Sequence, residues 1–207
     1  MPQPAIQHAV IVAHPSPTSL SLELAQSYAH AVHALGQGCI VRDLYRIGFD
    51  PCLKADELPW APGYQVAADV QRERKLIGEA KVFAFVYPLW FNAPPAILKG
   101  YVDRVFSMGF GYEPGPAGNE PLLGGRQLIS ISTSGAPDQW IKSTGALDTL
   151  SQGFDQHVAA VCGLTVADHL HFGGVTPGIT AESVKAMQTV VENAVRHTFE
   201  AAYLEGV

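Results

Sequence analysis

Five short strand-like segments, each followed by a stretch of helical periodicity, constrain the fold of this chain more than any other feature. The segments are Ala9–Ala13, Cys39–Val41, Val82–Tyr87, Gln127–Thr133 and Thr165–Phe172. Continuous apolar runs, as in the first three, indicate strands that are buried on both faces. Strands that alternate with helices are typical of a parallel sheet covered on both sides. The sequence therefore predicts an α/β fold in a single domain over residues 1–207.

The helical segments are bounded by residues that cap helices or break them. Gly36 ends the apolar periodicity that begins at Leu20, and Thr180 suits the start of the terminal helix. Asn92 resembles an N-cap, since prolines in a first turn lose no hydrogen bond. The predicted helices are Leu20–Leu35, Ala67–Ala80, Asn92–Phe106, Thr144–Cys162 and Thr180–Leu204.

Two long segments rich in proline and glycine lie between these elements, Arg46–Tyr64 and Gly109–Gly125. Both are predicted to be irregular. Loops of this length in a compact domain are usually functional or inserted. We therefore expect them to contact a cofactor, a substrate or a second subunit.

Composition excludes several classes of protein. Only 15% of residues are charged and the formal net charge is −6, which argues against nucleic acid or an anionic membrane as the main partner. No apolar run approaches the roughly 20 residues that span a bilayer. The three cysteines cannot all pair in disulfides and form no C-x-x-C motif, which favours a reducing compartment. We expect a cytoplasmic protein without a membrane span.

Three polar or aromatic segments follow predicted strands, namely His14–Ser21, Pro88–Asn92 and Thr133–Trp140. Ligands of open parallel sheets bind beyond the carboxyl ends of the strands, so these segments are expected to meet at one site. The first offers hydroxyls and a helix N-terminus that suit a phosphate, or else only caps its helix. It contains neither a G-x-G-x-x-G fingerprint nor a Walker loop. The second would clamp a planar ring or form an apolar plug.

Several motifs together resemble the NAD(P)H:quinone oxidoreductase family, also called DT-diaphorase-like. They include Ala13-His-Pro15, Gly48-Phe-Asp-Pro51 and Tyr87-Pro-Leu-Trp90. The most specific are Pro95-Ala-Ile-Leu-Lys-Gly100 and Asp103-Arg-Val-Phe106. The resemblance covers about residues 6–175. It implies a flavodoxin-like three-layer sandwich, with a five-stranded parallel sheet in the order 2-1-3-4-5.

The resemblance also implies a bound flavin, FAD by preference and FMN as the alternative, and a homodimer with its sites at the subunit interface. In that family hydride passes from NAD(P)H through flavin N5 to a quinone or similar acceptor by a ping-pong mechanism. Its residue pattern assigns three groups of cofactor contacts here. Phosphate and ribityl or adenosine contacts are expected from His14, Thr18, Ser19, Leu20 and Ser21. Ring contacts are expected from Pro88, Leu89, Trp90 and Phe91, and pyrimidine-edge contacts from Ser132, Thr133, Ser134 and Gly135.

Asp103 matches an acidic residue that reaches an adenosine ribose across the dimer. Trp140 stands where the family has a catalytic tyrosine, and Ala146 and Leu147 lie where a histidine is expected. Trp140, the candidate catalytic residue, keeps a ring and an N–H donor but has no phenolic proton. The resemblance therefore leaves proton handling and the preferred acceptor open.

Two other functions remain compatible with the sequence. One is a flavodoxin-type electron carrier, and the other is a regulatory flavoprotein subunit of a membrane transporter. His169 and His171 share one face of the last predicted strand, as a metal pair would. Because no third ligand accompanies them, we expect structural or site-lining roles and no metal site.

Overall fold

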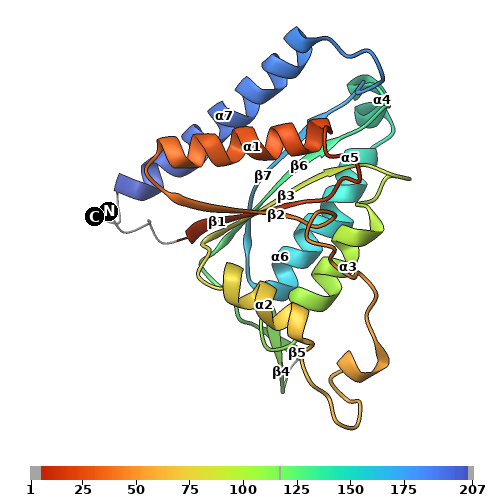
Figure 1. The fold of residues 1–207 in the computed structure, drawn as a ribbon, viewed down its shortest axis with the longest axis vertical. Helices are drawn as coiled ribbons and strands as arrows, with labels where there is room; N and C mark the ends of the chain where they lie inside the picture. Colours follow the sequence, from red (N-terminus) through yellow and green to blue (C-terminus); the bar gives the residue numbers. More distant parts are fainter. Residues whose placement is uncertain (1–5, 117, 205–207) are drawn as a thin grey trace.

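The computed structural model describes residues 6–116 and 118–204, and Figure 1 shows their arrangement. Five parallel strands form one sheet in the order β2-β1-β3-β6-β7. They are β1 (Ile6–Val12), β2 (Gly38–Asp43), β3 (Val82–Pro88), β6 (Gln127–Thr133) and β7 (Thr165–Phe172). Counted along the chain, this is the predicted order 2-1-3-4-5. The flavodoxin-like arrangement is therefore confirmed.

The apolar runs form the middle of the sheet, as their pattern predicts. Every residue of β3 is buried, and β1 contributes fully buried side chains from Ala9 to Ile11. Side chains on alternate faces of these strands enter two separate apolar clusters, one on each side of the sheet. Two-sided burial explains why the central strands read as continuous apolar runs.

Helices cover both faces of the sheet (Figure 1). Helices α1 (Leu20–Ala34) and α7 (Ala181–Leu204) pack against each other on one face. The other face is covered by α2 (Ala68–Ile77), α3 (Ala96–Val105) and α6 (His157–Cys162). Thr180 caps α7 through a hydrogen bond from the Ser183 amide to its Oγ1, 3.1 Å long, as expected.

The structure corrects three expectations. The segment Gly109–Gly125 is not wholly irregular, because it contains an antiparallel hairpin, β4 (Tyr112–Gly115) with β5 (Gly118–Pro121). In Figure 1 this hairpin lies at the bottom of the molecule, away from α4 and α5. It therefore does not border the carboxyl ends of the strands in its own chain.

The predicted helix Thr144–Cys162 begins earlier and is interrupted. It consists of α4 (Asp138–Ser143), α5 (Ala146–Leu150), the π-helical η2 (Ser151–Gln156) and α6. Gly145 separates the first two with φ of 66°, a left-handed conformation that glycine adopts readily. The wide η2 turn matters for the site because it places Asp155 against the sheet.

Asn92 does not cap α3, which begins at Ala96 after Pro95. The long segment after β2 is irregular, as predicted, apart from the 3₁₀ turn η1 (Ala55–Glu57). Arg104, 2% exposed, binds this segment through Glu57 and the Asp50 carbonyl oxygen, and also pairs with Asp69 of α2. A buried guanidinium thus attaches the loop to the α2–α3 layer.

Candidate active site at the carboxyl edge of the sheet

The carboxyl ends of β1, β3 and β6 bring the three predicted segments together. The Ala13 amide donates to the Val86 carbonyl oxygen (3.0 Å), and the Leu89 amide donates to the Thr133 carbonyl oxygen (2.7 Å). These bonds continue the sheet ladder into the loops. The loops after three adjacent strands therefore border one region, as the sequence predicts.

The first loop ends at the N-terminus of α1. Ser19 caps the helix, because its Oγ accepts a hydrogen bond from the Leu22 amide (3.3 Å). Among the described residues no hydrogen-bond partner exists for the amides of Leu20 and Ser21, and the buried Ser21 hydroxyl also lacks one. Unpaired amides at a helix N-terminus suit an anion. An orphaned buried hydroxyl in the same turn supplies the structural observation that this loop fits a phosphate.

Thr18 is exposed beside this helix start, and its Oγ1 lies 3.2 Å from Ser16 Oγ. His14, at the end of β1, accepts the Ser16 amide at Nδ1 (3.0 Å). Burial, with a smaller contribution from Arg46, lowers the pKa of His14. His14 is therefore a neutral hydrogen-bond acceptor at pH 7, which agrees with the amide that it binds.

Arg46 borders the candidate site, and the sequence analysis did not identify it. Its Nη2 donates to the carbonyl oxygens of His14 and Pro15, both at 2.7 Å. The guanidinium therefore closes the first loop and places a positive charge beside it. Its position just after β2 could have identified it, because β2 pairs with β1 and the loops after the two strands are neighbours.

The aromatic loop after β3 is a tight turn. Phe91 and Asn92 have φ of 52° and 55°, and the Trp90 and Ala93 backbones exchange two hydrogen bonds. Two successive left-handed residues between paired ends form a type I′ turn. The Asn92 side chain fixes this turn to the Ala146 carbonyl oxygen (3.0 Å). A local turn and a long-range hydrogen bond thus replace the expected cap.

This turn presents aromatic surface. Phe91 is fully exposed and Trp90 is 43% exposed, with the Trp90 ring 6.3 Å from the His14 ring. Pro88 is buried at the end of β3, and Leu89 is half-buried. The exposed rings argue against an apolar plug, because a plug would be covered by the protein itself. They favour a surface that a planar group stacks against.

The third loop, after β6, divides into buried and accessible residues. The Ser132 hydroxyl is fully buried and bound to two histidine rings, so it is not free for a ligand. Thr133 and Ser134 are also buried, whereas Gly135 is exposed at the edge. A β-carbon on Gly135 would contact nothing closer than the Val175 carbonyl oxygen, at 3.7 Å. Gly135 therefore has no steric requirement for glycine inside its own chain.

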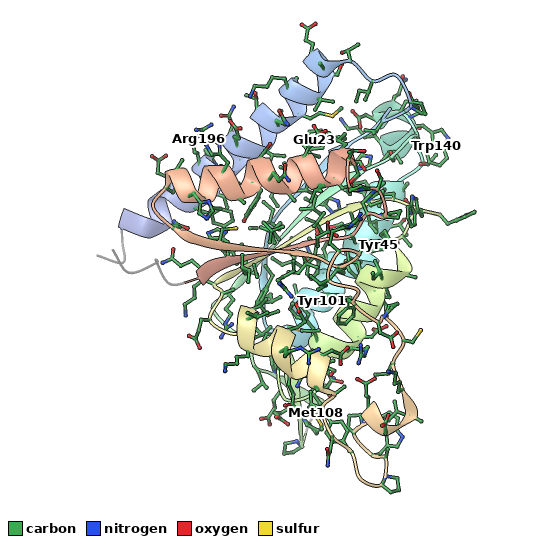
Figure 2. The ribbon with its side chains drawn as sticks, viewed as in Figure 1. Glu23, Tyr45, Tyr101, Met108, Trp140 and Arg196 are labelled. Carbon is green, nitrogen blue, oxygen red and sulfur yellow. The ribbon has the colours of Figure 1, made fainter. Side chains whose placement is uncertain are left out.

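Trp140 lies on α4, where its side chain is 54% exposed and projects outward (Figure 2). Asp103 lies on α3, the helix that leads away from the carboxyl edge. It is the eighth residue of that helix, about 10 Å along the axis from Ala96. Its carboxylate pairs with Lys99 at 2.6 Å on the surface. One chain therefore does not bring Asp103 to the first loop, at the N-terminus of α1.

A hydrolase-like arrangement lies below this edge. Ser132 Oγ is 2.7 Å from His169 Nε2, and His169 Nδ1 is 2.5 Å from Asp155 Oδ2. The order of contacts is that of a Ser-His-Asp triad. The Ser132 side chain is inaccessible, however, so no carbonyl substrate reaches it. In the described ranges, no three histidine, cysteine or acidic side chains group as metal ligands.

Comparisons with known proteins agree with this geometry. A family model described as a flavodoxin-like fold matches residues 7–195. An uncharacterised NAD(P)H oxidoreductase of Haemophilus influenzae is 32% identical over 171 residues, which cover 82% of this chain and 85% of that protein. The structure of an NAD(P)H:quinone oxidoreductase from Methanothermobacter marburgensis superposes with a TM-score of 0.78 at 27% identity. That alignment covers 93% of this chain and 96% of the other.

An FMN-dependent NADH-azoreductase of Bacillus anthracis, solved with FMN, shares the fold with a TM-score of 0.65 at 18% identity. That alignment covers 93% of this chain and 99% of the azoreductase. None of the described helices is long and apolar enough to cross a membrane. The matched family model and the relatives confirm the resemblance that the motifs carry, and the chain belongs to the flavodoxin-like family of NAD(P)H:quinone oxidoreductases.

Proposed function

We propose that this chain is a flavin-dependent NAD(P)H oxidoreductase that reduces a quinone or a similar acceptor by two electrons in a ping-pong cycle. The observation that carries the proposal is the meeting of two features at one edge of the sheet. A helix N-terminus with unpaired amides lies beside a turn that exposes two aromatic rings. A phosphate-bearing planar cofactor needs both features together.

The chain's own residues have distinct roles in this proposal. The amides of Leu20 and Ser21, with the hydroxyls of Thr18 and Ser21, would hold the cofactor phosphate. Arg46 stabilises the loop conformation that presents them. These contacts fix the cofactor without touching the reacting atoms, so their contribution to the rate is positioning.

Ring binding falls to the second and third loops. Leu89, Trp90 and Phe91 would line the isoalloxazine, and the backbone of Thr133 to Gly135 would border its pyrimidine edge. When bound, the flavin supplies the two-electron chemistry, accepting hydride from NAD(P)H and giving it to the acceptor. The exposed aromatic surface lets donor and acceptor use the same slot in turn, which supports ping-pong kinetics.

We propose FAD over FMN because the motifs Gly48–Pro51 and Asp103 resemble the FAD-binding branch. The position of Asp103, on the surface and away from the phosphate loop of its own chain, supports a role in a second subunit's site. We accordingly propose a cytoplasmic homodimer in which each chain is a single flavin-binding domain. Cross-linking of Asp103→Cys chains to an FAD analogue on a partner would test this arrangement.

The proposal is tested by the visible spectrum of purified protein, followed by denaturation and chromatography of the released chromophore. The expected result is one flavin per chain, identified as FAD. Protein that is colourless and takes up neither FAD nor FMN would overturn the proposal. Anaerobic bleaching of the bound flavin by NADPH then separates an enzyme from an electron carrier, which would bleach negligibly.

A further inference from the structure

An unbroken series of hydrogen bonds joins the carboxyl edge of β6 to a carboxylate in the core. Two strands contribute alternate side chains on one face, and η2 contributes the acid. From the edge inward, the contacts are Ser134 Oγ to His171 Nε2 (3.1 Å), His171 Nδ1 to Ser132 Oγ (2.8 Å), Ser132 Oγ to His169 Nε2 (2.7 Å) and His169 Nδ1 to Asp155 Oδ2 (2.5 Å). We call these five residues the relay.

The contacts fit two proton arrangements that differ by one proton. In the first, counting protons gives the direction of each bond. Ser134 donates its one hydroxyl proton to the Ala136 carbonyl oxygen (3.0 Å), so its oxygen accepts from His171 Nε2–H. A neutral His171 then has a bare Nδ1, which accepts the Ser132 hydroxyl proton. Ser132 Oγ must in turn accept from His169 Nε2–H.

This count leaves the His169–Asp155 pair, at the inner end of the relay, with one proton more than a neutral histidine and a carboxylate would hold. His169 already carries a proton on Nε2, yet its Nδ1 faces Asp155 Oδ2 at 2.5 Å. Two acceptors do not form a hydrogen bond, so a further proton lies between these atoms. Ser130 donates to the other Asp155 oxygen (2.7 Å), and Asp155 is completely buried. With Ser134 donating to Ala136, the relay is therefore loaded with one extra proton.

The relay can release that proton without any heavy atom moving far. The His171 Nε2–H bond breaks as a new Ser134 O–H bond forms, and the original Ser134 proton leaves to an acceptor. The Ser132 hydroxyl then passes its proton to His171 Nδ1, and His169 Nε2–H passes its proton to Ser132 Oγ. The final state, which is the second arrangement, has His169 Nδ1–H donating to an Asp155 carboxylate and all four contacts of the relay still bonded. The Ala136 carbonyl oxygen loses the Ser134 proton and keeps the Gly174 amide.

We propose that the relay stores and delivers the one proton that quinone reduction takes from solution, with Ser134 as its outlet. The proposal rests on the proposed function. Reduction by NAD(P)H brings two electrons and one proton as hydride, whereas a hydroquinone contains two added protons. One proton must therefore reach the acceptor from another source. In this chain Trp140 has no phenolic proton to give, and the relay ends at the edge that it shares with the β3 loop.

The surroundings allow the relay to be refilled. A cavity of about 230 Å³ beside β7 is lined by His169 and His171, with Asp138 and Lys142 from α4. It gives water access to both rings at the β7 edge of the sheet. Burial, with a smaller contribution from the nearby His169, lowers the pKa of His171 against an opposing effect of Asp138. The lowered pKa agrees with the neutral His171 ring of the relay.

One further titratable group faces the relay from β3. The Tyr87 ring lies 6.5 Å from the His169 ring, and its hydroxyl is buried. Burial, followed by the effect of Asp155, raises the pKa of Tyr87 well above its usual value, against a smaller opposing effect of Ser130. Tyr87 therefore stays protonated and neutral, and it does not act as the outlet.

The first test needs no flavin. Full-length protein with ¹⁵N-labelled histidine rings is titrated by NMR over the pH range in which it stays folded, with His169→Gln and His171→Gln used for assignment. At the acidic end we expect His171 to carry its proton on Nε2 and His169 to carry protons on both nitrogens. The two rings should change together in one step, and Ser132→Ala should uncouple them. Independent titrations, or a His171 proton on Nδ1 throughout, would overturn the proposal.

The second test separates the two half-reactions in the flavin-loaded enzyme by stopped flow. In Ser132→Ala, we expect the quinone-dependent half-reaction to fall about 100-fold, the scale of general acid catalysis. Reduction by NAD(P)H should change less than twofold. Ser132→Thr keeps the hydroxyl and should recover the pH profile.

The matched control is Ser27→Ala, which removes a buried hydroxyl that donates to the Glu23 carbonyl oxygen outside the relay. It should behave as wild type in both half-reactions. Equal losses in both half-reactions of Ser132→Ala would mean a structural role and would overturn the proposal. Wild-type protein that NAD(P)H does not reduce would instead refute the proposed function, and the NMR result would still decide the relay.

Discussion

Acidification should destabilise this protein through one buried histidine, His8. Its ring is 1% exposed on β1, with Nδ1 2.9 Å from the Tyr28 hydroxyl and Nε2 2.7 Å from the Gln37 amide oxygen. The Phe199 ring of α7 packs edge-on against it, with centroids 4.9 Å apart. Gln37 Oε1 requires a proton on Nε2, so Nδ1 accepts from Tyr28. The neutral ring is thus fully bonded.

The magnitude follows from the pKa of His8, which burial lowers from 6.5 to about 4, against a smaller opposing effect of the Gln37 hydrogen bond. The folded state binds this proton less readily than the unfolded state. The free energy of unfolding therefore falls as pH drops from 6.5 towards 4. Above pH 6.5 the full stability of the neutral His8 ring is present. Between pH 7 and pH 5, linkage gives a loss of about 2 kcal/mol from this group alone.

The assay is urea unfolding at pH 7, 6 and 5 for wild type and His8→Gln, with the exposed His30→Gln as a matched control. We expect His8→Gln to lose about 2 kcal/mol less stability than wild type over this range. The control should follow wild type. If His8→Gln and wild type lose stability in parallel, the neutral buried histidine is not the cause and the reasoning fails.

Three further perturbations probe other parts of the account. Arg104→Met should leave the carboxylates of Glu57 and Asp69 without their partner and lower the free energy of unfolding by about 3–5 kcal/mol. In calorimetry the melting temperature should fall by about 10 °C, and an unchanged melting temperature would contradict the anchoring role of Arg104. Burial raises the pKa of Cys39 to about 12 and that of Cys162 to about 11. At pH 7 a thiol reagent should therefore label only the exposed Cys52 in the folded protein, and all three cysteines after denaturation. Arg46→Gln should weaken flavin binding about tenfold, measured by fluorescence titration, whereas the exposed Arg196→Gln serves as the control. Equal flavin affinity in the two variants would exclude a role of Arg46 at the first loop.

The sheet was predictable because its information is local. Burial on both faces makes a central strand apolar at every position, so Val82–Pro88 is visible in the sequence without knowledge of its neighbours. Strand order came from the motif resemblance, since periodicity alone does not rank parallel topologies. The hairpin within Gly109–Gly125 was missed because its proline and glycine content resembles that of a loop.

Parts of the site were not predictable because they depend on register and on distant contacts. Ser132 and His171 face each other only because β6 and β7 pair in one register, and a one-residue slip would point them to opposite faces. Asp155 reaches them through a π-helical turn that has no clear sequence signature. Arg46 was missed for a similar reason, since its carbonyl partners lie more than 30 residues away in the sequence.

The most direct test of the central claim is anaerobic rapid mixing of flavin-loaded protein with NADPH, followed by a second mix with a quinone. The account predicts loss of the visible flavin absorbance in the first mix and its full return in the second. One NADP⁺ and one hydroquinone should form per flavin. Flavin that remains oxidised with both NADPH and NADH, or reduced flavin that quinone does not reoxidise, would contradict the claim.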